Sequence, residues 1–295
     1  MNDGVLILNK PSGITSHDAV GKIRRLFGTR AVGHTGTLDP MASGVLVILT
    51  GSATKASEYA MRHNKIYRAG MLLGIVTDTE DTSGSILEKS DDVPSEKEVL
   101  DAVGKFRGDI MQTPPMYSAL KIGGKKLCDL AREGITVERE ARPVHIYSIE
   151  AHREDDRNYI LDVSCSKGTY IRTLCADIGA ALGCGAAMSS LVRTGAGGFS
   201  LADAVTLEAL ESMSASERFA LLRPTESLFC DLATVVLPDF YARLARNGAE
   251  IYQHKIKTDF PPETMLRVYD KDGFFAIGEV RLYEEGSAIK LIKRF

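Results

Sequence analysis

One histidine and one aspartate lie in a stretch of small residues, 33–44, directly before a run of apolar residues. Glycines let a second backbone or a nucleotide approach closely, and Pro40 restricts the backbone of Asp39. A buried strand behind such a loop would give the aspartate a rigid mount. Gly-rich and Asp-Pro sequences also form ordinary turns. The stretch is therefore either a simple turn or a loop that holds a catalytic carboxylate.

The cysteines and histidines lack the spacing of a metal site. The five cysteines contain no C-x-x-C pair, and their odd number does not suit a disulfide framework. No two of the six histidines stand at helical or zinc-finger spacing. We therefore predict reduced thiols and no metal.

Strands and a helix must position this loop. Apolar alternation and β-branched runs predict strands at 4–9, 45–49, 65–73, 144–152 and 159–164. A helix is expected after the first strand, with Ser16 as its N-cap and an apolar stripe that includes Val20 and Ile23. Together these elements predict an α/β (α+β) fold built on a large mixed or antiparallel sheet flanked by helices.

The remaining segments indicate loops and a second domain. Residues 77–94 and 112–124 are polar or rich in proline and glycine, so we predict long surface loops there. Residues 201–222 have a helical composition, and the pattern of the sequence changes after Phe229. We place a domain boundary near 230 and predict a small β-rich C-terminal module with strands at 265–269, 274–280 and 288–292.

Composition limits the class of protein. Hydrophobic residues make up 44% and charged residues 25%, which is typical of a globular protein. The net charge of -3 means that a polyanionic partner would need a local basic patch. No stretch approaches the roughly 20 apolar residues of a membrane span, and residues 1–10 do not resemble a secretion signal. We expect a cytoplasmic protein that does not bind membranes.

Residues 33–44 resemble the G-H-x-G-x-L-D-P-x-A-x-G signature of the tRNA pseudouridine synthase B (TruB) family, in its bacterial stand-alone form. Further family motifs are K-P-x-G-x-T-S, a basic-x-Tyr element, an RNA-gripping insertion, S-x-G-T-Y-I-R and L-x-R-T-x-x-G-x-F. They match residues 10–16, 65–67, 113–121, 166–172 and 191–199, respectively. Six ordered motifs do not coincide by chance, and the resemblance spans about residues 5 to 230.

The resemblance implies an isomerase that converts the T-loop uridine-55 of tRNA to pseudouridine without a cofactor. It gives Asp39 as the catalytic carboxylate, Arg172 as its charge partner, and Tyr67 as a residue that stacks on the base and helps to remove the C5 proton. Attack of Asp39 on C1′ and a glycal route are both open. Substrate-binding roles are implied for His34, Tyr67, Tyr170, Leu191, Lys10 and Lys121.

RNA contacts are expected outside the catalytic cluster as well. His34 resembles the family histidine that fills the stack left by a flipped base, although a structural hydrogen bond is an equal alternative. An insertion at about 105–142, with Lys121, Lys125, Lys126 and Arg132, would hold the T stem-loop backbone. Cys128 stands where many relatives carry a tyrosine. Residues 231–295 resemble a PUA domain, a small β-barrel that would hold the acceptor stem, leaving 1–230 as the catalytic domain.

Two alternative functions remain. The chain could be a tRNA-binding or tRNA-folding module without catalysis, or the catalytic subunit of a guide-RNA-dependent synthase. The intact set of Asp39, Tyr67, Tyr170 and Arg172 argues against the first. The insertion and the lack of a long basic tail argue against the second. We expect tRNA as the partner and no obligate protein partner.

Overall fold

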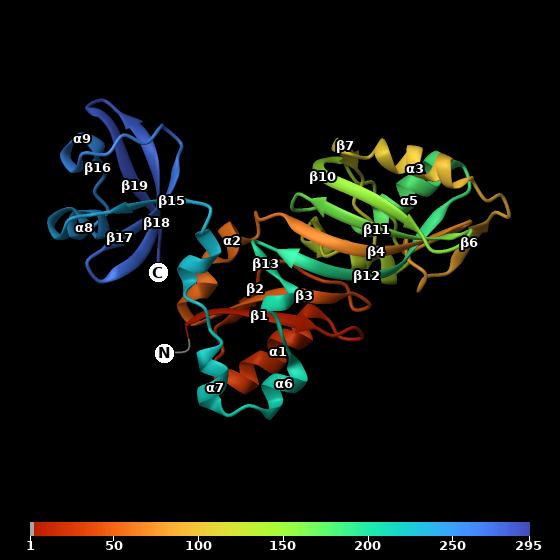
Figure 1. The fold of residues 1–295 in the computed structure, drawn as a ribbon, viewed down its shortest axis with the longest axis horizontal. Coiled ribbons are helices and arrows are strands. Elements are labelled where there is room, and N and C mark those ends of the chain that lie inside the picture. The colour runs from red at the N-terminus through yellow and green to blue at the C-terminus, as the bar shows by residue number, and fades with distance from the viewer. Residues whose placement is uncertain (1–2) are drawn as a thin grey trace.

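A ten-stranded mixed sheet forms the centre of the protein, whose computed structural model describes residues 3–295 (Figure 1). The strand order is β14-β1-β3-β12-β4-β11-β10-β7, with β13 paired to β12 and β2 paired to β3. The strands are β1 (Gly4–Lys10), β2 (Val32–His34), β3 (Ser43–Thr50), β4 (Lys65–Leu73), β7 (Gly108–Gln112), β10 (Arg142–Arg153), β11 (Asn158–Cys165), β12 (Ala186–Ala196), β13 (Phe199–Ser200) and β14 (Val205–Thr206).

Both faces of β1 and β3 are buried, whereas β7 and β10 have many exposed residues. Along β1, Leu6 and Leu8 belong to one hydrophobic core, whereas Val5 and Ile7 belong to a second core on the opposite face. Strands that are covered on both sides read as continuous apolar runs, and this explains the sequence of β1 and β3. The strands predicted at 4–9, 45–49, 65–73, 144–152 and 159–164 are confirmed, as is the large mixed sheet.

Helices cover the sheet and its edges. They are α1 (Ser16–Phe27), α2 (Ser57–Ala60), α3 (Glu96–Gly104), α5 (Ile171–Leu182), α6 (Leu207–Ser212) and α7 (Ala215–Ala220). The N-cap of α1 is Thr15, whose hydroxyl accepts from the Asp18 N–H while the Asp18 carboxylate accepts from the Thr15 N–H. The prediction that Ser16 caps this helix is wrong by one residue, because the Ser16 hydroxyl bonds to Leu38 instead.

Three predicted loops or helices differ from the structure. Residues 77–94 are not a simple surface loop, because β5 (Ile75–Thr77) pairs with β6 (Ile86–Lys89) and Asp81 between them is buried. The segment 112–124 begins with a buried Gln112 and ends in strand β8. Residues 201–222 form two short helices rather than one, since Ser214 caps a new helix start at α7.

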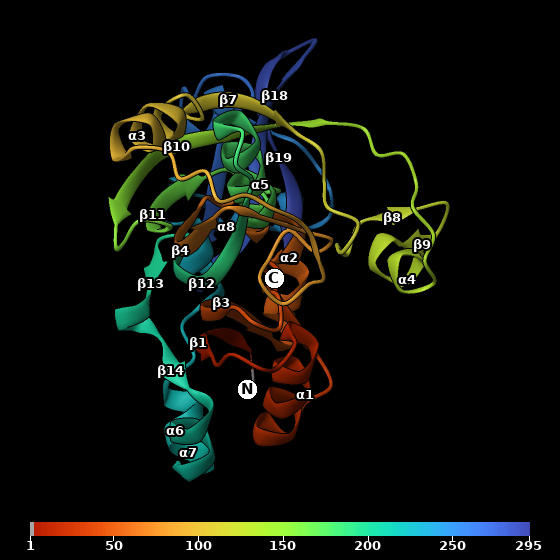
Figure 2. The ribbon, with the colours of Figure 1, turned by 90° about the vertical axis from the view of Figure 1, so that its right-hand side faces the viewer.

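An arm projects from the body between β7 and β10 (Figure 2). It consists of the hairpin β8 (Lys121–Ile122) and β9 (Lys125–Lys126), followed by α4 (Leu127–Arg132). Gly123 and Gly124 join the two strands with φ of 58° and 85°, which a two-residue hairpin turn requires. The arm lies within the range of about 105–142 in which the sequence predicts an insertion, but β7 in that range belongs to the central sheet.

The C-terminal region forms a separate five-stranded sheet in the order β15-β17-β18-β19-β16. Its elements are β15 (Ala233–Val236), α8 (Asp239–Arg246), β16 (Ile251–Tyr252), α9 (Gln253–Ile256), β17 (Met265–Asp270), β18 (Gly273–Tyr283) and β19 (Gly286–Arg294). The three predicted C-terminal strands are confirmed. This sheet has its own core, and Ile277 joins Leu228 and Phe229 in the core beneath β1 and β3. Within residues 3–295, no helix has the length and apolar character of a membrane span.

Candidate active site

The loop between β2 and β3 carries Asp39 and is anchored by the segment before α1. The Leu38 N–H donates to the Ser16 hydroxyl at 2.8 Å, and that hydroxyl lies 3.1 Å from the Leu38 carbonyl oxygen. The Gly13 N–H donates to the Pro40 carbonyl oxygen at 2.8 Å. Two motifs that are distant in sequence therefore fix the backbone on both sides of Asp39.

Gly44 lets the strand after this loop lie close to β12. Its φ is +105°, and a Cβ placed there would be 2.2 Å from the carbonyl oxygen of Arg193. A side chain at this position would push the strands apart and strain the backbone. The glycine that ends the motif is therefore required by the close approach of β3 and β12.

Arg172, on the first turn of α5, pairs with Asp39. Its Nε lies 2.9 Å from Asp39 Oδ2, and the arginine side chain is 6% exposed against 35% for the aspartate. Its Nη1 donates to the Thr79 carbonyl oxygen at 3.0 Å and its Nη2 to that of Tyr117 at 2.8 Å. The guanidinium is held on three sides, so it presents one fixed edge to a carboxylate that stays accessible.

Asp81 is a second carboxylate beside the same guanidinium, and the sequence did not reveal it. Its Oδ2 lies 3.9 Å from Arg172 Nε, and the residue is 6% exposed. Its other oxygen accepts from the Thr79 hydroxyl at 2.8 Å and from the Ser83 N–H at 3.0 Å. Its position in an acidic, polar segment indicated solvent exposure, so no pattern pointed to it.

Tyr67 lies on β4, directly opposite Arg193 on β12. Burial raises the pKa of the Tyr67 phenol, whereas the charge of Arg193 and a hydrogen bond from it act in the other direction. Arg193 also donates to the carbonyl oxygens of Val45 at 2.6 Å, Gly36 at 3.1 Å and Thr37 at 3.4 Å. Sequence reasoning missed Arg193, although its place two residues after the buried Leu191 in a strand indicates an inward side chain.

Tyr170 and Leu191 are the two residues predicted to line a base pocket together with Tyr67. Tyr170 caps α5, and its N–H donates to Gln112 Oε1 at 2.7 Å while Gln112 Nε2 donates to the Tyr170 carbonyl oxygen at 3.0 Å. Leu191 is 7% exposed on β12, opposite Ala69. The buried Gln112 amide, which sequence reasoning placed at the start of a surface loop, therefore sets the backbone position of Tyr170.

Lys10 and His34 lie on either side of the Asp39 loop. The Lys10 ammonium is buried and donates to the carbonyl oxygens of Pro11 and Ile14, both at 2.8 Å. Burial lowers the pKa of Lys10 to about 8, against the effect of Asp39. His34 is half-buried, and its Nδ1 accepts from the Gly36 N–H at 3.3 Å. Burial lowers the pKa of His34 as well, with a further contribution from Arg193.

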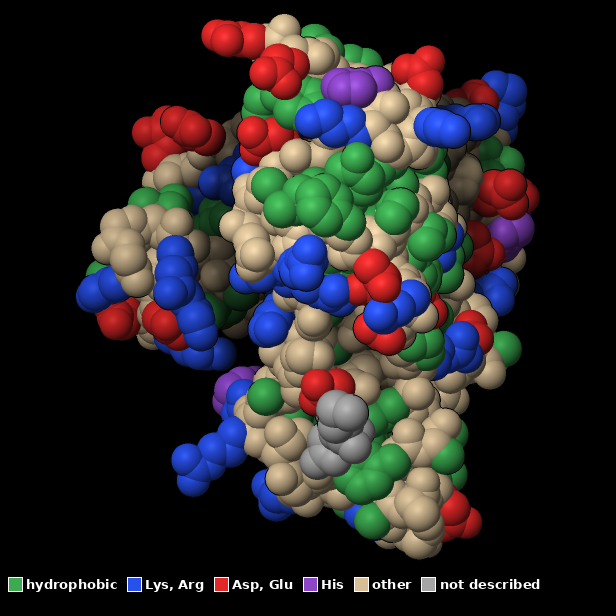
Figure 3. All heavy atoms as spheres, turned by 90° about the vertical axis from the view of Figure 1, so that its left-hand side faces the viewer, with side chains coloured by type: hydrophobic (Ala, Val, Ile, Leu, Met, Phe, Trp, Pro, Cys, Tyr) green, Lys and Arg blue, Asp and Glu red, His purple; other side chains and the backbone are tan. Residues whose placement is uncertain are grey.

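Basic side chains gather on the arm, away from the Asp39 cluster. Lys121, Lys125 and Lys126 are exposed. Lys125 has an acidic neighbour, Glu133, at 3.8 Å. Figure 3 shows Lys and Arg side chains on the projecting lobe and on the body opposite it. Cys128 is half-buried on α4, and its N–H donates to the Ser118 carbonyl oxygen at 3.0 Å.

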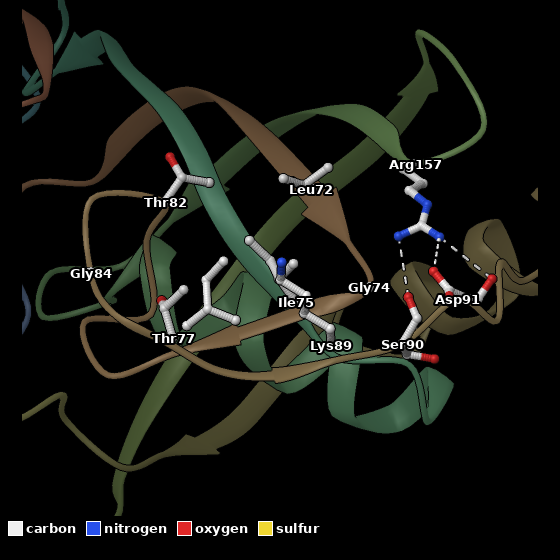
Figure 4. A pocket seen from close by; sticks show the side chains of 11 residues that line it. Leu72, Gly74, Ile75, Thr77, Thr82, Gly84, Lys89, Ser90, Asp91 and Arg157 are labelled. Atoms are coloured by element: carbon white, nitrogen blue, oxygen red, sulfur yellow. Dashed lines mark hydrogen bonds and ion pairs between the residues drawn. The ribbon is translucent and has the colours of Figure 1, made fainter.

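A cavity of about 540 Å³ lies beside the β5–β6 hairpin and does not include Asp39 (Figure 4). Arg157 closes one side of it by donating to Ser90 and Asp91. The Thr77 side chain, in its wall, donates to the Asp81 carbonyl oxygen at 2.7 Å. The cavity is thus a neighbour of the segment that holds Arg172 and not part of the cluster itself.

The cysteines are all free thiols, as predicted. Burial raises the pKa of Cys165 to about 11 and that of Cys175 to about 12, so neither is a thiolate at neutral pH. Among residues 3–295, no group of three or more His, Cys, Asp or Glu side chains is arranged to hold a metal ion. The absence of a metal from the reaction remains a prediction.

Known proteins resemble this chain over nearly its whole length. Residues 24–171 match the TruB family pseudouridylate synthase (N terminal domain), and residues 172–230 match the tRNA pseudouridylate synthase B C-terminal domain. The tRNA pseudouridine synthase B of Clostridium tetani is 41% identical over 94% of this chain and 95% of its own. The tRNA pseudouridine synthase B of Azoarcus sp. is 47% identical over 94% of this chain and 91% of its own. A chain in the crystal structure of a Cbf5-Nop10-Gar1 complex is 27% identical, with a TM-score of 0.74 over 99% of this chain and 85% of its own.

Proposed function

The chain belongs to the TruB family of pseudouridylate synthases, and from that premise we propose that it isomerises uridine-55 in the T loop of tRNA to pseudouridine. The observation that carries the assignment of its site is the Asp39 carboxylate, 2.9 Å from the buried Arg172 guanidinium, in a loop anchored on both sides. The reaction breaks the C1′–N1 bond, turns the uracil and joins C5 to C1′. The C5 proton is then lost and N1 gains a proton.

Asp39 supplies the carboxylate for the first bond cleavage. Two routes suit it: attack on C1′ to give a covalent sugar ester, or removal of a sugar proton to give a glycal. Arg172 orients this carboxylate in either route, because its Nε lies 2.9 Å from Asp39 Oδ2 and its other nitrogens are held by two backbone carbonyls. The 35% exposure of the Asp39 side chain leaves it open to a ribose.

Tyr67, Tyr170 and Leu191 would hold the base while it turns. An aromatic ring offers a stacking face that does not depend on the orientation of the base within its plane. Leu191 adds an apolar wall without hydrogen-bonding groups that would fix one orientation. The Tyr67 hydroxyl would also help to remove the C5 proton, as the family resemblance implies.

Recognition of tRNA involves regions outside this cluster. The target base must leave its stack, at a cost of a few kcal/mol, and His34 at the mouth of the Asp39 loop would fill the gap. The exposed lysines of the arm would contact phosphates of the T stem-loop. The second sheet, residues 233–294, would act as the PUA-like domain that binds the acceptor stem, adding affinity through a second contact. A cytoplasmic location follows from this substrate.

The two alternative functions receive less support. A non-catalytic module would not need a buried guanidinium beside an accessible carboxylate, which is costly to maintain. A guide-RNA-dependent subunit is favoured only by the likeness to Cbf5, which is weaker in identity than the likeness to tRNA pseudouridine synthase B. We therefore expect activity without a guide RNA or a second protein.

Purified protein and unmodified tRNA provide the test. Wild-type protein should form pseudouridine at position 55 alone, as seen by nucleoside mapping, and should also act on an isolated T-arm stem-loop. Asp39→Asn should bind the same tRNA and form no product. Binding without product by the wild type would support the non-catalytic module, and a need for added RNA or protein would support the guided enzyme.

A further inference from the structure

Arg193 is a buried cation with no assigned role in the reaction. Its side chain is among the largest fully buried ones in the protein. Three hydrogen bonds join it to backbone carbonyls, and within residues 3–295 no carboxylate oxygen lies within 4.0 Å of its guanidinium. Neutral carbonyls compensate only part of the cost of burying a charge. A group that opposes stability in this way is often retained at a functional site.

The contacts of Arg193 join the two halves of the candidate site. Two of its carbonyl partners are Gly36 and Thr37, which come directly before Leu38 and Asp39 in the catalytic loop. Its backbone stands opposite Tyr67 in the antiparallel β12–β4 ladder, and directly opposite residues of such a pair place their side chains next to each other on one face. A single planar group therefore bonds to the loop of the carboxylate and lies beside the aromatic side chain that we propose to stack on the base.

We propose that Arg193 is a positioning residue that fixes the Asp39 loop and the Tyr67 hydroxyl in one geometry, so that both meet the same nucleotide. This inference rests on the proposed function. In the proposed reaction Asp39 detaches the uracil, and the uracil then turns against Tyr67. The distance between these two side chains must therefore stay constant through the reaction. The planar fork of arginine can bond to three carbonyls at once while it stays beside the Tyr67 side chain, whereas a lysine ammonium has a single centre.

Arg193 also differs from the nearby lysines in keeping its positive charge over the whole working pH range. Burial lowers the pKa of Lys10 and of Lys65 to about 8 each, so both lose charge in mildly alkaline solution. A guanidinium keeps its proton there. The positioning role that we assign to Arg193 therefore does not depend on pH in the range near pH 8, where these two lysines lose their charge.

A double-mutant cycle tests the link to Tyr67. Single-turnover rates of pseudouridine formation are measured for wild type, Arg193→Lys, Tyr67→Phe and the double variant, with saturating unmodified tRNA. Arg193→Lys should slow the reaction about 10- to 100-fold in the wild-type background. The loss should be at least about 3-fold smaller when Tyr67 already lacks its hydroxyl, because only the hold on the Asp39 loop then remains to be lost, and tRNA affinity should be unchanged. Equal effects in both backgrounds, or none in either, would overturn the proposal.

Hydrogen exchange over residues 35–42 tests the link to the loop without reference to activity. Exchange should be faster in Arg193→Lys and Arg193→Met than in wild type, and unchanged exchange would contradict the proposed hold on the Asp39 loop. If both variants fail to fold, Arg193 serves stability alone and the proposal is also overturned. Absence of product from wild type would instead refute the proposed function, so the two failures are distinguishable.

Arg218 offers a matched control. On α7 its guanidinium also bonds to backbone carbonyls, those of Leu210, Leu26 and Glu211, and it has no contact with the catalytic cluster in the described chain. Arg218→Lys should lower stability while leaving the rate at saturating tRNA within 2-fold of wild type. If Arg218→Lys slowed the reaction as much as Arg193→Lys does, the loss of any buried arginine-to-carbonyl bonds would slow the enzyme, contrary to the proposal.

Discussion

Arg172 Nε lies 2.9 Å from Asp39 Oδ2, and the remaining nitrogens of the same guanidinium bond to the carbonyls of Thr79 and Tyr117. Removing one preorganised donor from an active site commonly slows catalysis by about 100- to 1000-fold. Arg172→Met should therefore reduce the single-turnover rate by about that factor. The rate of Arg172→Lys should lie between those of wild type and Arg172→Met, because a lysine ammonium retains the charge but not the planar set of donors of the guanidinium.

Arg157 provides the control for that prediction. It too donates to a backbone carbonyl, that of Ser90, and to a carboxylate, that of Asp91, but it lies at the cavity beside β5 and β6. Arg157→Met should leave the rate within a few-fold of wild type. If Arg172→Met retained a comparable rate, the pair with Asp39 would have no part in the chemistry.

Gln112 should prove important to stability through Tyr170. Its amide both accepts from the Tyr170 N–H and donates to the Tyr170 carbonyl, and it is 1% exposed. Gln112→Met preserves the volume but leaves the Tyr170 N–H without its partner, although the Tyr170 carbonyl oxygen keeps its bond from the Leu174 N–H. The unfolding free energy should therefore fall by about 1–3 kcal/mol. Urea denaturation measures this loss. The exposed neighbour Met111 is the control, and Met111→Ala should change stability by less than about 0.5 kcal/mol.

The pH dependence of stability should report on His34. Burial and Arg193 lower its pKa below the ordinary 6.5, so the folded state binds this proton less readily than the unfolded state. Its contribution is complete above pH 6.5 and is lost as the pH falls through the folded pKa. The unfolding free energy of wild type minus that of His34→Gln should therefore decrease from pH 7 to pH 5. A difference that stays constant would mean that the imidazole is not desolvated.

The arm should contribute affinity that depends on salt. Replacing Lys121, Lys125 and Lys126 together with alanine should weaken tRNA binding and flatten the slope of log affinity against log salt. The slope should fall by about 0.7–0.9 for each phosphate that the protein no longer neutralises. Filter binding at several salt concentrations measures it. Lys97 on α3, whose side chain is 84% exposed, provides the control, and Lys97→Ala should leave the slope unaltered. An unaltered slope in the triple arm variant would contradict the prediction.

The strands and the catalytic loop could be predicted because their signals are local. Alternation located β4 to the residue, and the small residues around Asp39 indicated a constrained loop. By contrast, Asp81 and Gln112 were assigned to surface loops because polar neighbours normally indicate solvent. What buries them is contact with residues that are distant in sequence, Arg172 and Tyr170. Such long-range partners leave no periodic pattern.

Ambiguity between equivalent residues explains the smaller errors. Thr15 and Ser16 are both good N-cap residues, and only the Leu38 backbone, which engages the Ser16 hydroxyl, decides between them. In the C-terminal sheet, the short β16 and α9 have too few residues to show any periodicity. Their positions depend on pairing with β19.

The bonds of Gln112 to Tyr170 and of Tyr117 to Arg172 tie both ends of a six-residue stretch to the start of α5. Insertions or deletions in that stretch would displace the start of α5 and with it Arg172, so the length of the stretch should be constant among active enzymes of the family. Within the part of the chain that the structure describes, the glycine turn at the tip of the arm makes no such bonds to the body. Variation in length, and grafted sequences that redirect the enzyme to other RNA shapes, should be tolerated there.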